Sequence, residues 1–111
     1  MNPLPVVVVP VYNALEALDG CLAALDATLP AGTRVLLADD ASPDPRIAPM
    51  LAGWCARTAL EARHVRRERN LGFPGNCNAA FADTGDADLV LLNSDTVPAG
   101  DWLGAIARCA A

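Results

Sequence analysis

The sequence of 111 residues contains no lysine, so all eight of its cationic side chains are arginines. It also lacks long apolar runs: "VVVV" at 6–9 and "LVLL" at 89–92 are far shorter than the ~20 residues that cross a bilayer. No basic, apolar leader opens it, so we predict no secretion signal and a cytoplasmic location. The net charge of −5 disfavours nucleic acid as a partner, and nothing indicates membrane contact.

Paired cysteines are missing as well. The four cysteines are widely spaced and form no C-x-x-C pair, so zinc ligation is not supported. A disulfide framework would be unusual in a chain without an export signal. We therefore expect free thiols that pack as small hydrophobic side chains. These residues are Cys21, Cys55, Cys77 and Cys109.

Along the sequence, short apolar runs alternate with amphipathic stretches. With 53% apolar and 19% charged residues, disorder is excluded, and the length suits a single domain over 1–111. Strand–helix alternation repeated four times predicts an α/β fold, with a mostly parallel sheet of about four strands flanked by helices. The predicted strands are 6–11, 34–40, 62–67 and 89–95. The predicted helices begin after Asn13, after 41–45 and near 75, and the last spans 101–111.

The spacing of apolar side chains predicts which residues of these helices face the core. Asn13 can cap the first helix, because its side-chain oxygen accepts from an orphan backbone N–H. That helix has an apolar stripe and ends at Pro30 and Gly32. The more polar third strand suits a sheet edge, where His64 would be a half-exposed structural residue. The expected apolar residues of the helices are Leu15, Leu18, Leu22 and Leu25 in the first, Met50, Leu51, Trp54 and Leu60 in the second, and Trp102 in the last.

Polar residues gather where the predicted strands end. In open parallel sheets, ligands bind at the carboxyl ends of the strands. Here those ends carry Tyr12-Asn13, Asp39-Asp40, the loop 69–75 and 93–95. This arrangement predicts a binding site along one edge of an otherwise apolar sheet.

Asn93 and Asp95 are two positions apart at a predicted strand end, so their side chains should point the same way. A carboxylate beside an amide oxygen suits a hard divalent cation, Mg²⁺ or Mn²⁺. The alternative is that "NSDT" only begins a turn, which Asn, Ser and Asp all favour.

Asp39 and Asp40 form an acidic pair after the second strand. Adjacent carboxylates repel each other unless a donor or cation faces one of them. A pyrimidine N–H or ribose hydroxyls would be suitable donors. Alternatively, one aspartate caps the helix that follows.

The segment "RNLGFPGNCNAAF" (69–81) places a bulky apolar residue, Phe73, among glycines. Gly72 and Gly75 permit positive φ and close approach, and Asn76 or Asn78 could cap the helix behind. The start of that helix would attract anions, and Arg69 would add a positive fork. The segment matches neither G-x-G-x-x-G nor a phosphate loop, and a plain structural turn is the alternative.

The order "VVVVPVYN", "LLADDAS", "NLGFPGNCNAAF" and "LLNSDT" resembles the nucleotide-binding half of the family-two inverting glycosyltransferases, which have the glycosyltransferase A-type fold. The loop and "LLNSDT" look most like rhamnosyltransferase-like members. The resemblance spans nearly all of 6–103. It implies binding of a UDP- or dTDP-linked sugar with a divalent cation, and a role in cell-envelope polysaccharide synthesis.

The resemblance also implies site roles. The nucleotide pocket would be lined by Pro10, Tyr12, Asn13, Asp39 or Asp40, Arg69, Asn70, Gly72, Gly75 and Asn93, with Tyr12 near the base. Asp95 would match the last carboxylate of the family's Asp-x-Asp metal motif. The motif reads Asn93-Ser94-Asp95 here, so the missing first carboxylate should weaken metal affinity. A cation bridging Asp95 and the diphosphate would stabilise the leaving group.

The family's acceptor-binding half and catalytic base have no match in this sequence, and the resemblance places the base beyond Ala111. We therefore expect a donor-binding half, truncated or a natural fragment, that transfers no sugar alone. Uncovered apolar surface predicts self-association or dependence on another chain.

The alternative function is a non-catalytic nucleotide-binding or scaffolding module. A phosphorelay receiver is disfavoured because its acidic pair follows the first strand and it uses a lysine. A nucleotidyltransferase is disfavoured because no basic, glycine-rich loop follows 6–11.

Overall fold

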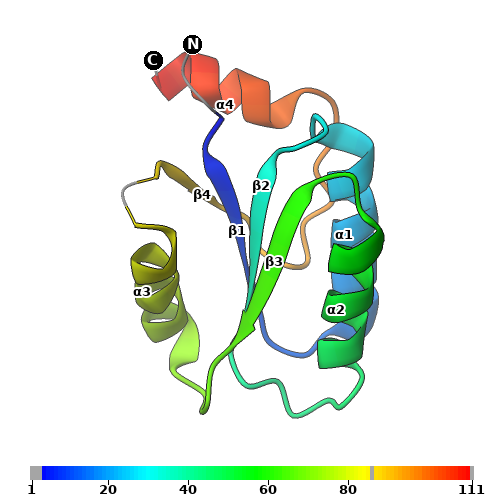
Figure 1. The fold of residues 1–111 in the computed structure, drawn as a ribbon, viewed down its shortest axis with the longest axis vertical. Helices are drawn as coiled ribbons and strands as arrows, with labels where there is room; N and C mark the ends of the chain where they lie inside the picture. Colours follow the sequence, from blue (N-terminus) through cyan, green and yellow to red (C-terminus); the bar gives the residue numbers. More distant parts are fainter. Residues whose placement is uncertain (1–3, 86, 111) are drawn as a thin grey trace.

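The computed structural model describes residues 4–85 and 87–110, with side chains as far as Ile106 (Figure 1). Its centre is a four-stranded sheet in the order β3-β2-β1-β4. All three strand pairings are parallel, so the predicted α/β architecture is confirmed. The strands are β1 (Val6–Val11), β2 (Arg34–Asp39), β3 (Glu61–Arg66) and β4 (Leu89–Leu91).

Helices cover both faces of this sheet. Figure 1 shows α1 and α2 on one face and α3 on the other, while α4 lies at the end of the sheet where the strands begin. The helices are α1 (Leu15–Thr28), α2 (Ile47–Arg57), α3 (Gly72–Thr84) and α4 (Trp102–Ala110). None of the helices in the described ranges is long and apolar enough to cross a membrane.

The strand β1 is buried on both faces, which explains its continuous β-branched run. Val7, Val9 and Val11 join the larger core beneath α1 and α2, where the predicted leucine stripe of α1 also packs. Val6 and Val8 point the other way, into a smaller cluster with Ala80 of α3. Alternate side chains of one central strand therefore anchor both helical layers.

Both tryptophans join helices to this core. Trp54 is fully buried, as predicted, and its Nε1 donates to Asp26 on α1 at 2.8 Å. Trp102 packs against the larger core, and its Nε1 donates to Thr28 Oγ1 at 2.8 Å. The second bond fixes α4 beside the last turn of α1.

The strand β3 forms one edge of the sheet, and His64 on it is exposed, in agreement with the more polar sequence. The three cysteines whose side chains are described, Cys21, Cys55 and Cys77, are free thiols. Burial raises the pKa of each. The side chain of Cys109 lies outside the described residues.

Several predicted boundaries were wrong. The last strand ends at Leu91 rather than residue 95. The Leu92 N–H makes one more bond to the sheet, and the strand stops there because 93–96 forms a turn. The third helix begins at Gly72, three residues early, so Asn76 and Asn78 lie inside it and cannot cap it. Leu60 is buried, but it follows α2 rather than belonging to it.

The final helix agrees with the prediction to within one residue at its start, since α4 begins at Trp102 rather than at residue 101. Its predicted last residue, Ala111, lies outside the described residues. The catalytic base expected beyond Ala111 therefore lies outside them as well.

The predicted cap of α1 was wrong. The N-cap position is Ala14, in the left-handed conformation, and no side chain caps it. The Asn13 side chain instead accepts a bond from the Asp44 backbone N–H at 3.0 Å. Tertiary contact between two loops thus replaces a local cap.

Candidate nucleotide-binding site

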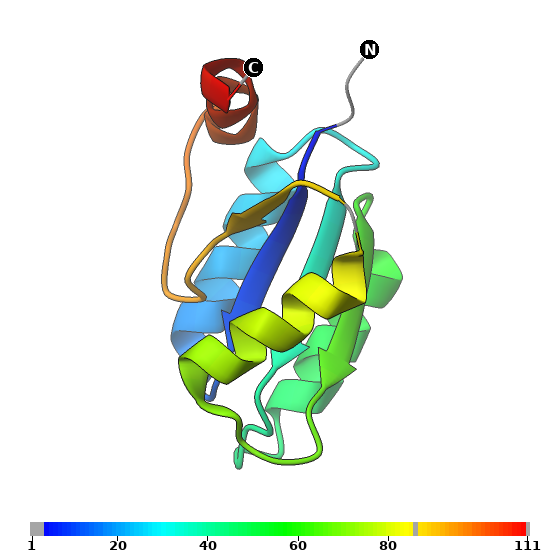
Figure 2. The same ribbon diagram turned by 90° about the vertical axis from the view of Figure 1, so that its left-hand side faces the viewer.

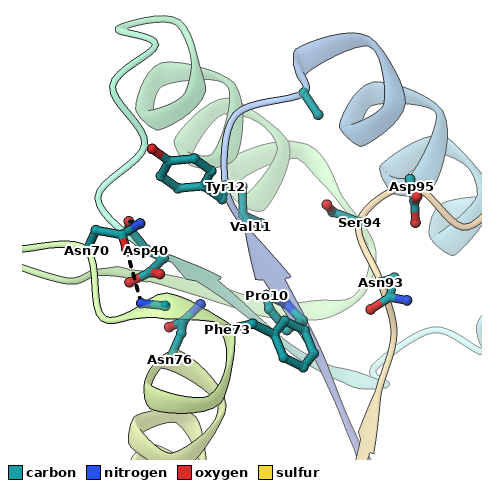
Figure 3. A pocket seen from close by; sticks show the side chains of 12 residues that line it. Pro10, Val11, Tyr12, Asp40, Asn70, Phe73, Asn76, Asn93, Ser94 and Asp95 are labelled. Carbon is teal, nitrogen blue, oxygen red and sulfur yellow. Dashed lines mark hydrogen bonds between the residues drawn. The ribbon is translucent and has the colours of Figure 1, made fainter.

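A cavity of about 450 Å³ lies at the carboxyl ends of the strands (Figure 3). Its walls come from the ends of β1 and β2, the start of α3 and the turn after β4. These segments are far apart in the sequence, and parallel strands bring their ends to one edge (Figure 2). The lining residues are Pro10, Val11, Tyr12, Ala14, Asp40, Asn70, Gly72, Phe73, Asn76, Asn93, Ser94 and Asp95.

The end of β1 contributes a buried proline and an exposed aromatic ring. Pro10 and Tyr12 line the cavity, and Tyr12 is 50% exposed. Asn13 does not line it. Its backbone N–H donates to Ser42 Oγ at 2.9 Å, and its side chain bonds to Asp44. Asn13 therefore joins the loop after β1 to the loop after β2.

These two loops hold unusual backbone conformations. Asn13, Ala14 and Ala41 have φ values of 50°, 58° and 57°, in the left-handed region that non-glycine residues seldom adopt. Each such residue costs roughly 1 kcal/mol. The bonds between Asn13, Ser42 and Asp44 offset this strain, which is concentrated at the rim of the cavity.

Asp39 serves the structure of the loop. It is 1% exposed; its Oδ1 accepts from the Ser42 N–H at 2.9 Å, and its Oδ2 pairs with Arg66 Nη1 at 2.8 Å. Arg66 is thus the cation that the two adjacent carboxylates were expected to need. Asp39 does not line the cavity.

Asp40 points to the opposite side and lines the cavity, although it is only 4% exposed. Its Oδ1 accepts from the Leu71 N–H at 2.7 Å, and its backbone carbonyl accepts from Asn70 Nδ2 at 3.2 Å. The carboxylate thus sits at the start of α3, where a negative charge is favoured. Of the two aspartates, Asp40 is the one that can face a ligand.

The start of α3 is already hydrogen-bonded within the chain. Gly72 adopts a φ of 77°, and its N–H donates to Asn70 Oδ1 at 3.1 Å. Together with the Leu71–Asp40 bond, this engages two backbone donors at the start of α3, the helix end that was predicted, near residue 75, to attract an anion. Pro74 in the same turn has no N–H.

The two remaining residues predicted for this wall lie elsewhere. Arg69 is exposed and is not part of the cavity lining. Gly75 lies within α3 and does not line the cavity either; a Cβ there would be 3.0 Å from Leu71 Cβ. The absence of a side chain at Gly75 therefore serves packing within the helix.

Asn76 is a lining residue whose role the sequence did not reveal. It is buried; its Nδ2 donates to the Ala38 carbonyl at 2.9 Å, and its Oδ1 accepts from Arg67 Nε at 2.9 Å. Arg67 also pairs with Asp83 at 2.9 Å. These bonds fasten α3 to the end of β2.

Phe73 and Ser94 also line the cavity, although the sequence analysis assigned neither of them a site role. The placement of Phe73 among glycines was the one signal that its ring would be exposed. Ser94 gave no such signal, because serine is common in turns of every kind.

The opposite end of the cavity is a turn. The Thr96 N–H donates to the Asn93 carbonyl at 3.0 Å, so 93–96 is a turn and not the strand end that was expected. Asn93, Ser94 and Asp95 nevertheless all line the cavity. The thiol of Cys21 also faces the Asn93 carbonyl, at 3.9 Å. Burial, and secondly the charge of Asp95, raises the pKa of this thiol to about 11.

This turn offers oxygen donors for a hard cation. Within the described residues, no three His, Cys, Asp or Glu side chains converge on a metal site. The Asp95 carboxylate, with amide and hydroxyl oxygens next to it in sequence, fits Mg²⁺ or Mn²⁺ only where a ligand supplies further oxygens. That is the usual arrangement for Mg²⁺ with substrate phosphates.

Asp40, Gly72 and Asp95 therefore lie on one cavity, at the sheet edge where the sequence predicted a binding site. The structure describes all of the lining residues. Two of them, Asp40 and Asp95, have charged side chains, and both are acidic. An anionic ligand would meet Asp40 at one end and Asp95 at the other. A diphosphate is accommodated more easily beside Asp95, because a cation can join it to the exposed carboxylate there.

The sequence model of a family described as glycosyl transferase family 2 matches residues 6–110. No curated protein matches the chain with significance. Among solved structures, residues 1–349 of Staphylococcus aureus TarS superimpose with a TM-score of 0.72 at 22% identity, covering 93% of this chain and 31% of that one.

Two ligand complexes are also similar in fold. The S. aureus TarS 1–349 complex with UDP has a TM-score of 0.62 at 23% identity, covering 81% of this chain and 27% of that one. A mannosyltransferase from Pyrobaculum calidifontis, in complex with GDP-Man and Mn²⁺, has a TM-score of 0.75 at 22% identity, covering 89% and 30%. The present chain spans about a third of the length of these structures.

Proposed function

Because the chain belongs to glycosyl transferase family 2, we propose that its cavity binds a pyrimidine nucleotide-diphosphate sugar, UDP- or dTDP-linked, whose sugar is transferred to an acceptor hydroxyl with inversion. One observation carries this proposal: Asp40, Gly72 and Asp95 come from the loop after β2, the start of α3 and the turn after β4, and they line the same cavity. Its volume of about 450 Å³ lies within the usual range of small-molecule sites.

The chemistry of the two ends orients this ligand. Asp40 is a buried acceptor beside the exposed ring of Tyr12, a combination suited to the N–H donors and flat face of a base or to ribose hydroxyls. The diphosphate then lies toward Asn93-Ser94-Asp95. Asp95, with the phosphate oxygens, would hold Mg²⁺ or Mn²⁺, which supplies charge stabilisation for the leaving diphosphate.

Inversion also requires a general base that deprotonates the acceptor hydroxyl. Neither carboxylate of the cavity is suited to this role, because Asp40 is bonded to the start of α3 and Asp95 is assigned to the proposed cation. We therefore assign the base to a residue beyond Ala111, outside the described residues, and we expect this chain to bind donor without transferring sugar. Sugar transfer by the purified chain to any acceptor would refute this assignment.

Calorimetric titration of the purified chain tests the proposal. The ligands are UDP, dTDP and GDP and their sugar conjugates, each with and without Mn²⁺. We expect pyrimidine nucleotides to bind more tightly than GDP, and Mn²⁺ to tighten binding of the diphosphates. Absence of binding by every nucleotide would overturn the proposal, and stronger binding of GDP would overturn the pyrimidine preference.

A non-catalytic nucleotide-binding module is the second candidate. It is favoured by the contrast between a buried Asp40, whose Oδ1 is held by the Leu71 N–H, and an exposed Asp95 in a part of the chain where no three His, Cys, Asp or Glu side chains of the described residues converge. Such a module would use the Asp40 end without a cation. Its nucleotide affinity would not depend on Mn²⁺, in either the native chain or a variant lacking the Asp95 carboxylate.

A further inference from the structure

The cavity exposes two aromatic rings, and the proposed nucleotide accounts for one of them. Tyr12 is 50% exposed and lies beside Asp40 and Asn70, at the end assigned to the base (Figure 3). Phe73 is 57% exposed, the largest exposed fraction of any Phe, Tyr or Trp in the described residues. An exposed ring that lines a concave site is placed to contact a ligand bound there.

Phe73 is held at a defined position, although its ring is exposed. It is the second residue of α3, whose start is fixed by the Leu71–Asp40 and Gly72–Asn70 bonds. One turn further on, Asn76 fastens the helix to the end of β2. The backbone that carries the ring is therefore rigid, which is a requirement for a recognition residue.

The ring lies away from Tyr12. In Figure 3 it projects from α3 past Pro10 toward the side of the cavity formed by Asn93. With the base beside Tyr12 and the diphosphate beside Asp95, the group attached to the diphosphate is the part of the ligand available to this ring. That group is the transferred sugar.

A sugar ring has a face made of C–H groups, which are weakly positive, and the face of an aromatic ring is negative. Resting on the proposed function above, we propose that Phe73 is a specificity-determining residue that contacts the C–H face of the transferred sugar. The lining residues, all within the described ranges, include two acidic and no basic side chains. The sugar that this site selects is therefore neutral, and a uronic acid is disfavoured.

The test compares nucleotides with and without the sugar. Calorimetry measures binding of UDP and UDP-glucose, and of dTDP and dTDP-glucose, in Mn²⁺ by the native chain, Phe73→Ala and Phe73→Tyr. We expect Phe73→Ala to weaken binding of the sugar conjugates at least about fivefold and to change the affinity for UDP and dTDP by less than about twofold. Phe73→Tyr should restore the affinity for the conjugates. The native chain should also bind UDP-glucose more tightly than UDP-glucuronate.

Phe81 provides the matched control. It lies on the same helix, is 43% exposed and does not line the cavity, so Phe81→Ala should leave every affinity unchanged. An equal effect of Phe73→Ala on nucleotides and conjugates, or no effect on either, would overturn the role of Phe73. Tighter binding of UDP-glucuronate would overturn the neutral-sugar preference. Lack of binding of any nucleotide by the native chain would instead overturn the proposed function.

Discussion

The two carboxylates of the cavity, Asp40 and Asp95, are held in contrasting ways. Asp40 is buried, bonded to the start of α3 and surrounded by loops that are linked to one another. Asp95 is exposed in a four-residue turn. The first end is already organised by bonds within the chain, whereas in the proposed function the second is completed by a ligand and a cation. Affinity should therefore arise at the first end and metal dependence at the second.

The largest effect is expected from Asp40→Ala. The Leu71 N–H would lose its acceptor, so the free energy of unfolding should fall by about 2 kcal/mol. UDP binding should fall below detection in calorimetry. Chemical denaturation measures the first effect. Asp19→Ala, which removes an exposed acid of α1, is the control and should change stability by less than ~0.5 kcal/mol.

Asp95→Ala tests the other end. Stability should change by less than ~0.5 kcal/mol because the side chain is exposed. The gain in UDP affinity on adding Mn²⁺ should disappear, a loss of at least about tenfold or ~1.4 kcal/mol. Titrations with and without Mn²⁺ measure this. An unchanged affinity in both conditions would favour the non-catalytic module.

Asn93→Asp should sharpen the contrast by adding a second carboxylate to the turn. In Mn²⁺ the affinity for UDP should rise about threefold to tenfold, since hard cations favour carboxylate oxygens. Without metal it should fall, because the added charge repels the diphosphate. Asn78→Asp makes the same change in charge on the exposed side of α3, away from the cavity lining. If Asn78→Asp reproduces both effects, the assignment of 93–96 as the cation-binding turn is wrong.

The smallest effect concerns the strained loop at the Asp40 end. Ala41 has a φ of 57°, which glycine adopts without strain. Ala41→Gly should stabilise the chain by between zero and about 1 kcal/mol, because relief of strain is partly cancelled by greater freedom of the unfolded chain. Thermal unfolding measures this. Ala23→Gly within α1 should instead lower the free energy of unfolding, by about 1 kcal/mol.

The sequence predicted the sheet and the location of the cavity well, because both depend on local patterns. Apolar runs identified three of the four strands and alternation with helices identified the more polar β3, and the parallel arrangement brought their polar ends together. The prediction was poorest where one side chain could have several partners. Asn13, Asn70 and Asn76 are the same residue type, yet one joins two loops, one bonds the start of α3 and one, inside α3, fastens that helix to β2.

The sequence by itself determined that an α/β sheet would form with polar and acidic residues at one edge, because the periodicity of apolar residues depends only on neighbours along the chain. Only the tertiary structure decided which of Asp39 and Asp40 faces the cavity. Consecutive residues of an extended segment point to opposite sides, and Arg66, brought alongside β2 by β3, neutralises one carboxylate. The other is left to face Tyr12 and the start of α3, an assignment that depends on strand pairing across 27 residues of sequence.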